Sequence, residues 1–201
     1  LQRFPMRRRR PGEADAEKES PVAGDGGSGV QGKGAGQESM ELPAVAASCF
    51  RVAPVPGKGL GLMATVKIAP ETLVIAEAPV LFFTGTDTSW CSEAEKQLGK
   101  LTDEQREKVL DLQDVFTKGS EKSLEGILRT NSFSRGMSSD GVLCLMASRL
   151  NHSCLPNCDW CWDEERREVR VYTSVEIPEG EELCIHYVDI RARRAERAKN
   201  L

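Results

Sequence analysis

The sequence predicts a mainly β fold with a helical insertion in its middle. Residues 49–83 consist of short apolar stretches separated by glycine- and proline-rich turns, which is typical of short strands. Residues 93–130 instead carry apolar side chains at helical spacing among many charges. Strand-like stretches return in the last third of the chain. A chain of 201 residues is long enough for one such domain with an extension.

We expect residues 1–45 to form a disordered tail. Eight of the 18 glycines lie there, and the only aromatic residue of this stretch is Phe4. A segment of this composition cannot bury enough apolar surface to offset the chain entropy lost on folding. The arginine run at residues 7–10 is interpreted either as a solvated basic tail or as a nuclear address. Because the chain begins with Leu1 rather than methionine, we expect it to be a fragment or the product of a partial gene model.

Four short strands are predicted before residue 84, at 50–53, 63–66, 73–76 and 80–83. The first two are separated by a turn-rich stretch that contains Lys58-Gly59-Leu60-Gly61. Glycine has no Cβ, so such a turn lets the backbone come close to a ligand. Taken alone, an ordinary β-turn is the better interpretation. The stretch is not a dinucleotide-binding fingerprint, because a third glycine is missing and a strand follows in place of a helix.

The helical insertion is predicted over about residues 93–130. Thr102 and Gln105 lie three residues apart and supply a capping-type start for a helix in its second part. Leu124, Ile127 and Leu128 indicate a further helical turn or two.

A β-hairpin is predicted in the last third, where residues 159–162 and 168–172 flank the polar stretch 163–167. A turn at residues 178–181 then leads into an alternating strand at 182–187. Beyond it, the basic residues 191–201 are expected to begin a C-terminal helical extension that is truncated here.

Side chains suited to chemistry are concentrated in residues 144–187. This segment contains both histidines, both tyrosines and five of the seven cysteines. The pair Asn151-His152 can orient a polar ligand, or it can pin a hydrogen-bonded loop that binds nothing. Tyr187 ends the alternating strand, and the pattern alone favours a core aromatic residue with a satisfied hydroxyl.

Three closely spaced cysteines raise the question of a metal site. Cys154, Cys158 and Cys161 are close enough in sequence to share one zinc ion, and His152 or Cys184 could complete the set of four ligands. The usual paired C-x2-C pattern is absent, so free or partly buried thiols are the default interpretation.

Composition excludes several classes of function. The formal charge of −4 argues against a general nucleic-acid binder, so we expect no direct contact with nucleic acid. No run of 18 apolar residues and no secretory signal occurs, so we expect no membrane span. The odd number of unevenly spaced cysteines indicates a reducing compartment, in the nucleus, the cytoplasm or both.

Taken together, the motifs resemble those of the SET-domain protein lysine methyltransferases. Their order is a G-x-G turn (Gly59, Gly61), a central insertion, the run N-H-S-C-x-P-N at residues 151–157, and E-L-x-x-x-Y ending at Tyr187. Residues 130–133, 148–150 and 187–189 are similar to the SET-and-MYND group and the related fungal SET proteins. The resemblance covers roughly residues 49–200.

The resemblance implies a fold, a cofactor and a reaction. The fold is a β-clip-like SET domain over residues 46–190, made of small twisted sheets with a knot-like crossing near its C-terminus. The cofactor is S-adenosylmethionine, and the methyl acceptor is a lysine of a histone or another protein. The implied cofactor-binding residues are Lys58, Gly59, Leu60, Gly61, Arg149, Asn151 and His152. Tyr187 is the implied catalytic residue.

The chain also departs from the family's pattern. Many members carry a cysteine-rich segment after the final tyrosine, and its thiols bind zinc, sometimes together with the cysteine that corresponds to Cys154. No such cysteines follow Tyr187 here, so zinc at Cys154 is expected only with a missing segment. Either the chain is cut short before that segment, or this protein builds the corresponding wall differently. Two alternatives to the enzyme stay open. One is a non-catalytic SET-like module that binds a peptide or partner, and the other is a zinc scaffold centred on Cys154, Cys158 and Cys161.

Overall fold

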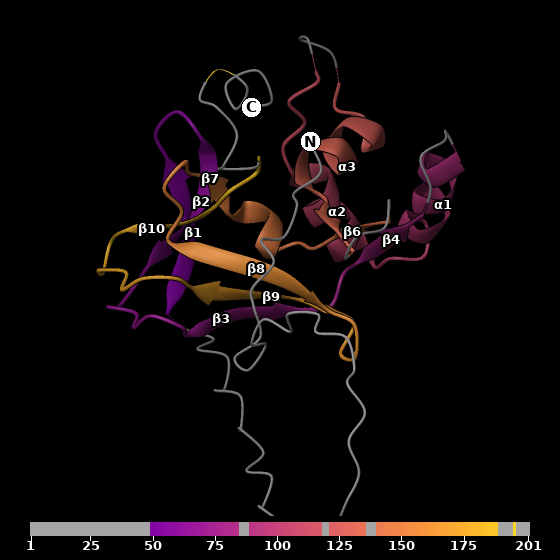
Figure 1. Cartoon of the computed structure of the whole chain (residues 1–201). Coiled ribbons are helices and arrows are strands. Elements are labelled where there is room, and N and C mark those ends of the chain that lie inside the picture. The colour runs from indigo at the N-terminus through magenta and orange to yellow at the C-terminus, as the bar shows by residue number, and fades with distance from the viewer. Residues whose placement is uncertain (1–48, 85–88, 118–120, 136–139, 189–194, 196–201) are drawn as a thin grey trace, which may run out of the picture. The chain divides into compact units, whose positions relative to one another are not determined.

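Ten strands and three α-helices make up the described part of the chain (Figure 1). The structure is a computed structural model that describes residues 49–84, 89–117, 121–135, 140–188 and 195. The strands are β1 (Phe50–Val55), β2 (Gly59–Ala64), β3 (Leu73–Glu77), β4 (Leu81–Phe83), β5 (Phe133–Ser134), β6 (Gly141–Leu143), β7 (Asn151–His152), β8 (Cys158–Asp163), β9 (Glu168–Thr173) and β10 (Glu182–Ile185). The helices are α1 (Ser89–Leu98), α2 (Asp103–Asp111) and α3 (Leu124–Asn131), and a 3-10 turn, η1 (Ala147–Arg149), precedes β7.

Two predicted segments cannot be compared with this structure. The predicted tail at residues 1–45 lies outside the described residues. The predicted C-terminal extension at 191–201 also lies outside them, apart from residue 195. None of the described helices is long and apolar enough to cross a membrane.

A four-stranded sheet in the order β1-β2-β10-β7 joins three segments that are far apart in the sequence. β1 and β2 form an antiparallel hairpin, and β10 pairs antiparallel with β2, with Glu182 opposite Met63. On its other side β10 runs parallel to β7, with Cys184 opposite Asn151. The sheet therefore places the glycine-rich hairpin and the Asn151-His152 pair on the two sides of one short strand.

The turn between β1 and β2 is shorter than predicted. It occupies residues 56–58, and the Lys58 N–H donates to the Val55 carbonyl at 3.0 Å. Gly59 and Gly61 lie in β2 instead, because six paired residues on each strand leave only three for the turn. Gly57 and Gly59 have φ values of +74° and +82°, a backbone region that glycine enters without steric cost.

The remaining strands form two three-stranded sheets, β3-β9-β8 and β4-β6-β5. The predicted hairpin is confirmed as β8 and β9, which pair from Cys158 opposite Thr173 to Asp163 opposite Glu168. β10 ends at Ile185, two residues before the predicted end at Tyr187. The chain leaves the sheet there because the Tyr187 N–H donates to His152 Nδ1 at 3.0 Å rather than to a strand.

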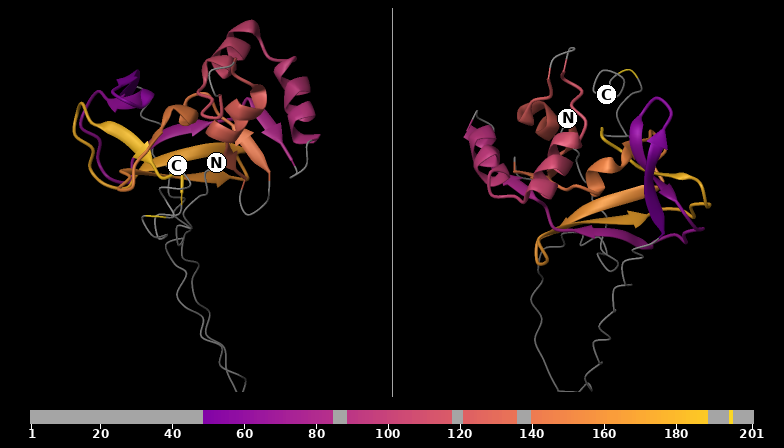
Figure 2. Two further views of the ribbon diagram at one scale, coloured as in Figure 1. Left: turned by 90° about the horizontal axis from the view of Figure 1, so that it is seen from above. Right: turned by 180° about the vertical axis from the view of Figure 1, so that it is seen from behind.

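The predicted helical insertion is confirmed as α1, α2 and α3, which lie together beside β4 and β6 (Figures 1 and 2). The predicted cap at the start of α2 is present, since the Thr102 side chain accepts from the Gln105 N–H and the Gln105 side chain bonds back to the Thr102 backbone. The insertion begins four residues earlier than predicted, at Ser89.

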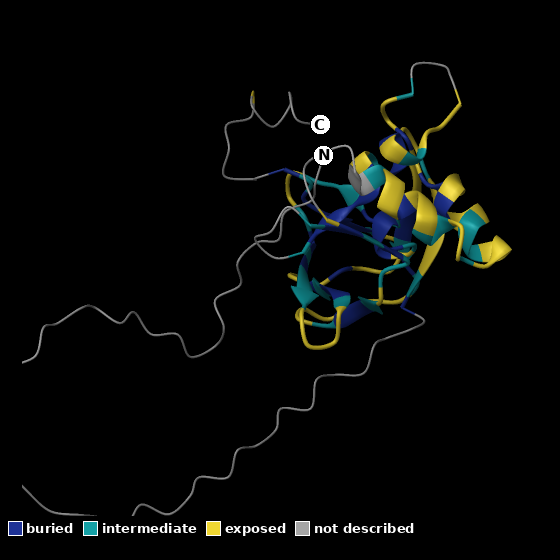
Figure 3. Cartoon of the chain, turned by 90° about the vertical axis from the view of Figure 1, so that its right-hand side faces the viewer, coloured by how far each residue is buried: buried dark blue, intermediate teal, exposed yellow. Residues whose placement is uncertain are grey.

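Two hydrophobic clusters hold these parts together. One joins the sheets and includes the fully buried Leu62, Trp160, Val171 and Ile185. The other packs the inner faces of the three helices against β4, and the outer faces of the helices are exposed (Figure 3). The predicted mainly β fold with a helical insertion is thus confirmed, whereas the knot-like threading of the chain stays a prediction.

Asp114 fixes the connection between α2 and α3. Its carboxylate accepts from the Phe116 N–H at 2.8 Å and from the Ser123 N–H at 3.0 Å. Gly126 lies against the same carboxylate, and a Cβ built there would come within 2.2 Å of both carboxylate oxygens. The loop between the two helices therefore depends on a glycine inside α3.

We predict that Gly126→Ala destabilises the protein by roughly 1–3 kcal/mol, because the added methyl group would displace Asp114 from its hydrogen bonds. The same substitution in an unobstructed helix stabilises by about 1 kcal/mol, so the sign of the change is informative. Urea unfolding monitored by circular dichroism measures the difference. Gly99→Ala is the matched control, since the atom nearest to a Cβ at Gly99 would be a backbone oxygen at 3.6 Å. A Gly126→Ala variant as stable as the parent would contradict the close contact between Gly126 and the Asp114 carboxylate.

Candidate active site

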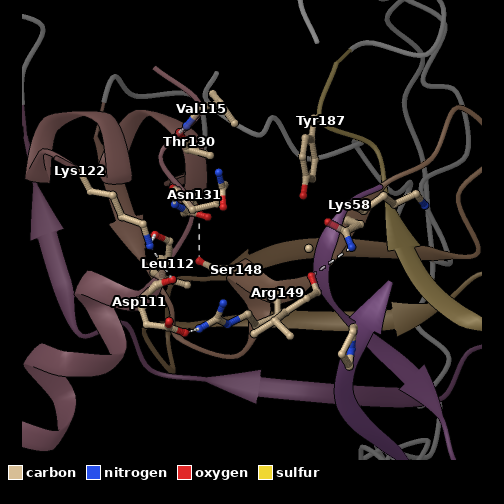
Figure 4. Close-up of a pocket in the computed structure, with 15 residues that line it drawn as sticks. Lys58, Asp111, Leu112, Val115, Lys122, Thr130, Asn131, Ser148, Arg149 and Tyr187 are labelled. Carbon is tan, nitrogen blue, oxygen red and sulfur yellow. Dashed lines mark hydrogen bonds and ion pairs between the residues drawn. The ribbon is translucent and has the colours of Figure 1, made fainter. Parts of the chain in front are cut away.

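A pocket of about 520 Å³ opens between the β1–β2 hairpin, the segment from η1 to β7, and the ends of α2 and α3 (Figure 4). Six of the eight predicted site residues line it: Lys58, Gly59, Leu60, Arg149, Asn151 and Tyr187. The other two, Gly61 and His152, lie behind the lining and contact residues that form it. The pocket thus gathers side chains from the first strands, the helical insertion and the end of the domain.

Asn151 is held by the strands on either side of it. Its Nδ2 donates to Glu182 Oε1 at 2.7 Å and to the Leu60 carbonyl at 3.2 Å. The second carboxylate oxygen of Glu182 accepts from Lys58 Nζ at 2.7 Å. Burial acts to raise the pKa of Glu182, but the hydrogen bonds from Lys58 and Asn151 outweigh it and hold that pKa below its ordinary value.

His152 orients Tyr187 from behind the pocket. Its Nδ1 accepts the Tyr187 N–H, so the neutral ring carries its proton on Nε2, which lies 3.3 Å from Cys154 Sγ. The two rings are tilted against each other with centroids 5.5 Å apart. The backbone of Tyr187 is therefore fixed by the neighbouring motif rather than by its own strand.

The Tyr187 hydroxyl donates to the Leu150 carbonyl at 2.5 Å, and its ring packs against the sheet cluster. The strand pattern had favoured a core aromatic residue with a satisfied hydroxyl, and the hydrogen bond agrees with that interpretation. The ring nevertheless also lines the pocket, where the phenolic oxygen points inward (Figure 4). Since its proton is used by Leu150, this oxygen can act toward a ligand as an acceptor.

The helical insertion forms the opposite wall. Arg149 makes an ion pair with Asp111 at the end of α2, across the pocket floor (Figure 4). The Ser148 hydroxyl donates to the Asn131 carbonyl at the end of α3, at 3.1 Å. These two contacts join the insertion to η1, the turn that leads into Asn151.

Lys122 caps the end of α2. Its ammonium group donates to the carbonyl groups of Leu110, Asp111 and Leu112 at 3.0–3.3 Å, which are among the carbonyls that a helix leaves unpaired. A cation is favourable at this end of a helix. Lys122 therefore brings a fixed positive charge to the insertion wall, in addition to that of Arg149 on η1.

Glu77 holds the segment that precedes the pocket. Its carboxylate accepts from the N–H groups of Leu145, Met146 and Ala147 at 2.7–3.1 Å. Asn157 does the same on the other side of the motif, since its amide bonds to the backbone of Glu182 and Cys184 in β10 at 2.8 Å. The Asn151-His152 pair is thus anchored before and after by polar side chains.

The three closely spaced cysteines do not form a metal site. Cys154 is exposed, Cys161 is half-buried, and Cys158 is fully buried, where burial raises the pKa of its thiol. Among the described residues no group of three or more His, Cys, Asp or Glu side chains is placed to hold a metal ion. Cys158 and Cys161 lie three residues apart on β8, so they point to opposite faces of the sheet. The zinc scaffold is therefore not supported.

Several residues of the site were not predicted. Glu182 belongs to the E-L-x-x-x-Y motif, and Asn131 and Ser148 lie in stretches that had already been singled out, so a signal existed for all three. Asp111 and Lys122 had no such signal. They are two charges in a helical segment full of charges, and only the fold brings them to the pocket.

Comparison with known proteins gives a consistent result. The family model described as SET domain matches residues 59–188. The histone-lysine N-methyltransferase set5 of Schizosaccharomyces pombe is 32% identical over 152 residues, which cover 76% of this chain and 46% of set5. The SET domain and MYND-type zinc finger protein 6 of the same organism is 43% identical over 75 residues, covering 37% of this chain and 14% of that protein. The chain thus spans less than half of the length of these relatives.

The Lys58–Glu182 pair should make stability depend on pH. The folded-state pKa of Glu182 is lowered, so its stabilising contribution is present above the unfolded pKa of about 4.3 and is lost as the pH falls through the lower folded value. We predict that Lys58→Met lowers the free energy of unfolding at pH 7, and that the deficit shrinks as the pH falls below about 4. Urea unfolding across this range measures it.

Lys67→Met is the matched control, because Lys67 pairs with Glu176 and both side chains are more than half exposed. Its effect on stability should be near zero at every pH. If the deficit of Lys58→Met were the same at pH 7 and below pH 4, the ion pair would not be what holds Glu182.

Proposed function

Because the chain belongs to the SET-domain family, we propose that residues 46–190 form the domain of a protein-lysine N-methyltransferase that uses S-adenosylmethionine. One observation carries this proposal. A single pocket gathers the Lys58 hairpin, Asn151 and Tyr187, which come from three separate motifs of the sequence. The Tyr187 oxygen points into this pocket, where it can act on a bound group (Figure 4).

The residues of the pocket fit the cofactor in size and polarity. S-Adenosylmethionine supplies an activated methyl group on a sulfonium centre. A volume of about 520 Å³ lies within the range usual for small-molecule sites. We assign the contacts with the cofactor to Lys58, Gly59, Leu60, Arg149 and Asn151.

Gly61 and His152 support these contacts from behind. Gly61 leaves room for Asn151, since a Cβ there would lie 2.8 Å from Asn151 Nδ2. His152 holds the backbone of Tyr187. Both belong to the proposed cofactor site in this sense, although neither lines the pocket.

Tyr187 is the proposed catalytic residue. A lysine amine has a pKa near 10.4, so it must lose a proton before it can attack a methyl group. Desolvation in a narrow channel beside a cation lowers that pKa. The Tyr187 oxygen, whose own proton is held by Leu150, would orient the amine toward the methyl group, and alignment of this kind supplies much of the rate enhancement. The amine would release that proton to water before it attacks, so no carboxylate base is required.

The substrate class is a protein that presents a lysine side chain. The relative set5 is named as a histone-lysine N-methyltransferase, so histones are the first substrates to test. Action in the nucleus, the cytoplasm or both is consistent with this class. Zinc enters the proposal only through a cysteine-rich segment that would join the exposed Cys154.

We predict that S-adenosylmethionine binds the 201-residue chain with one-to-one stoichiometry in a calorimetric titration, and that Asn151→Ala weakens this binding at least tenfold. The reason is that Asn151 offers hydrogen bonds inside a partly buried pocket, where loss of one to a charged group costs more than 1 kcal/mol. Absence of binding to the parent chain would favour the alternative, a SET-like module that binds a partner without reaction.

We further predict that Tyr187→Phe lowers the rate of methyl transfer to histones at least a hundredfold, while cofactor affinity changes less than about threefold. The hydroxyl acts on the reacting amine, whereas the ring that lines the pocket is retained. Tyr172→Phe is the matched control, because this other tyrosine lies on β9, where its hydroxyl accepts from Arg170. Equal losses of rate and cofactor affinity in Tyr187→Phe would contradict the catalytic role.

A further inference from the structure

The Glu182 side chain lies between two residues of the pocket, although it is not itself among the lining residues. One carboxylate oxygen accepts from Asn151 Nδ2 and the other from Lys58 Nζ, each at 2.7 Å. The side chain is only 14% exposed, compared with 42% for Lys58. Glu182 therefore reaches the pocket only through its two partners.

The sheet is built to permit this contact. Glu182 is the first residue of β10 and lies opposite Met63 of β2, two residues beyond Gly61. A Cβ at Gly61 would lie 2.7 Å from Glu182 Oε1 and 2.8 Å from Asn151 Nδ2. Any larger residue at position 61 would therefore occupy the space in which the carboxylate and the amide meet.

These contacts fix which end of the Asn151 amide faces Glu182. A carboxylate and a backbone carbonyl can only accept hydrogen bonds, so Nδ2 must point toward Glu182 and Leu60. Both of its hydrogens are then used. The oxygen Oδ1 is the remaining polar atom of the side chain, and no donor to it is found among the residues that the structure describes.

We propose that Glu182 is a positioning residue that sets the polarity of the pocket, by forcing Asn151 to present an acceptor to the ligand. A ligand group that donates hydrogen bonds, such as an ammonium group, is then favoured at this point, and a carboxylate is disfavoured. The inference rests on the proposed function for the identity of the ligand. The orientation of Asn151 itself does not depend on that function.

Lys58 is the third residue of this hydrogen-bonded arrangement. Its ammonium group neutralises the Glu182 carboxylate, so the carboxylate stays ionised close to the pocket without placing a net negative charge there. The lowered pKa of Glu182 agrees with this arrangement, because its hydrogen bonds to Lys58 and Asn151 outweigh the cost of burial. An ionised Glu182 has no proton to donate, so it can only accept a hydrogen bond from Asn151, which keeps the Asn151 amide in this orientation.

The proposal is tested by exchanging the donor and the acceptor between positions 151 and 182 and measuring the affinity for S-adenosylmethionine. Asn151→Asp alone would place two carboxylates in contact, and we expect its affinity in calorimetry to fall at least tenfold. In the double variant Asn151→Asp with Glu182→Gln, the glutamine amide donates to the aspartate, and an oxygen again faces the ligand. Its affinity should be at least threefold higher than that of Asn151→Asp alone, although the hydrogen bond to the Leu60 carbonyl is not restored.

If Glu182 and Asn151 only stabilised the fold, the affinities of the two variants would follow a different pattern. In that case the double variant would be at least as weak as Asn151→Asp alone, because both native side chains are lost. Equal affinities of these two variants would therefore overturn the proposal. Glu181→Ala is the matched control, since this neighbouring glutamate bonds to Asn157 rather than Asn151, and its affinity should be unchanged.

A second measurement separates this proposal from the proposed function. The side-chain NH₂ resonances of Asn151 can be identified by NMR as those that vanish in Asn151→Asp. In the parent chain both protons should exchange slowly, and Glu182→Ala should speed their exchange at least tenfold, whereas Glu181→Ala should not. Unchanged exchange in Glu182→Ala overturns the positioning role. If that role is confirmed but the parent chain binds no cofactor, the proposed function fails alone.

Discussion

The site depends on one short strand that pairs on both sides. β10 pairs antiparallel with β2 and parallel with β7, so its four residues place the glycine-rich hairpin beside the Asn151-His152 pair. Parallel pairing of so short a strand gains little by itself. Polar side chains reinforce it, because Asn157 bonds to the backbone of β10 and Glu182 bonds to Asn151. The pocket exists because these contacts hold three distant segments in register.

The charged groups around the pocket are already paired within the protein. Glu182 lies between Lys58 and Asn151, Arg149 pairs with Asp111, and Lys122 caps α2. Each group is thereby held in one place before a ligand arrives, so little reorganisation is needed when it binds. Besides any contribution to folding stability, these contacts fix the directions and signs of charge within the pocket.

The sequence revealed what depends on neighbouring residues and missed what depends on the fold. The helical insertion, the cap at Thr102 and the β8–β9 hairpin follow from local pattern and were predicted. The placement of Gly59 and Gly61 inside β2 follows from pairing with β1, which local turn chemistry does not encode. Six residues that line the pocket could be predicted because their motifs occur in a recognisable order. Asp111 at the end of α2 and Lys122 in the connection to α3 carry charges like many others in the insertion, so nothing in the sequence distinguishes them.

The two walls of the pocket are held by separate sets of contacts. On the sheet side, Lys58, Glu182 and Asn151 bond to one another. On the insertion side, Asp111 and Asn131 bond to η1, which Glu77 anchors through the N–H groups of its first residue and of the two residues before it. A substitution in α2 or α3 can therefore move one wall while the hydrogen bonds of the other remain. The sheet thus fixes the orientation of Asn151, whereas the insertion supplies Lys122 and holds Arg149, so both walls contribute to the charges that a ligand would meet.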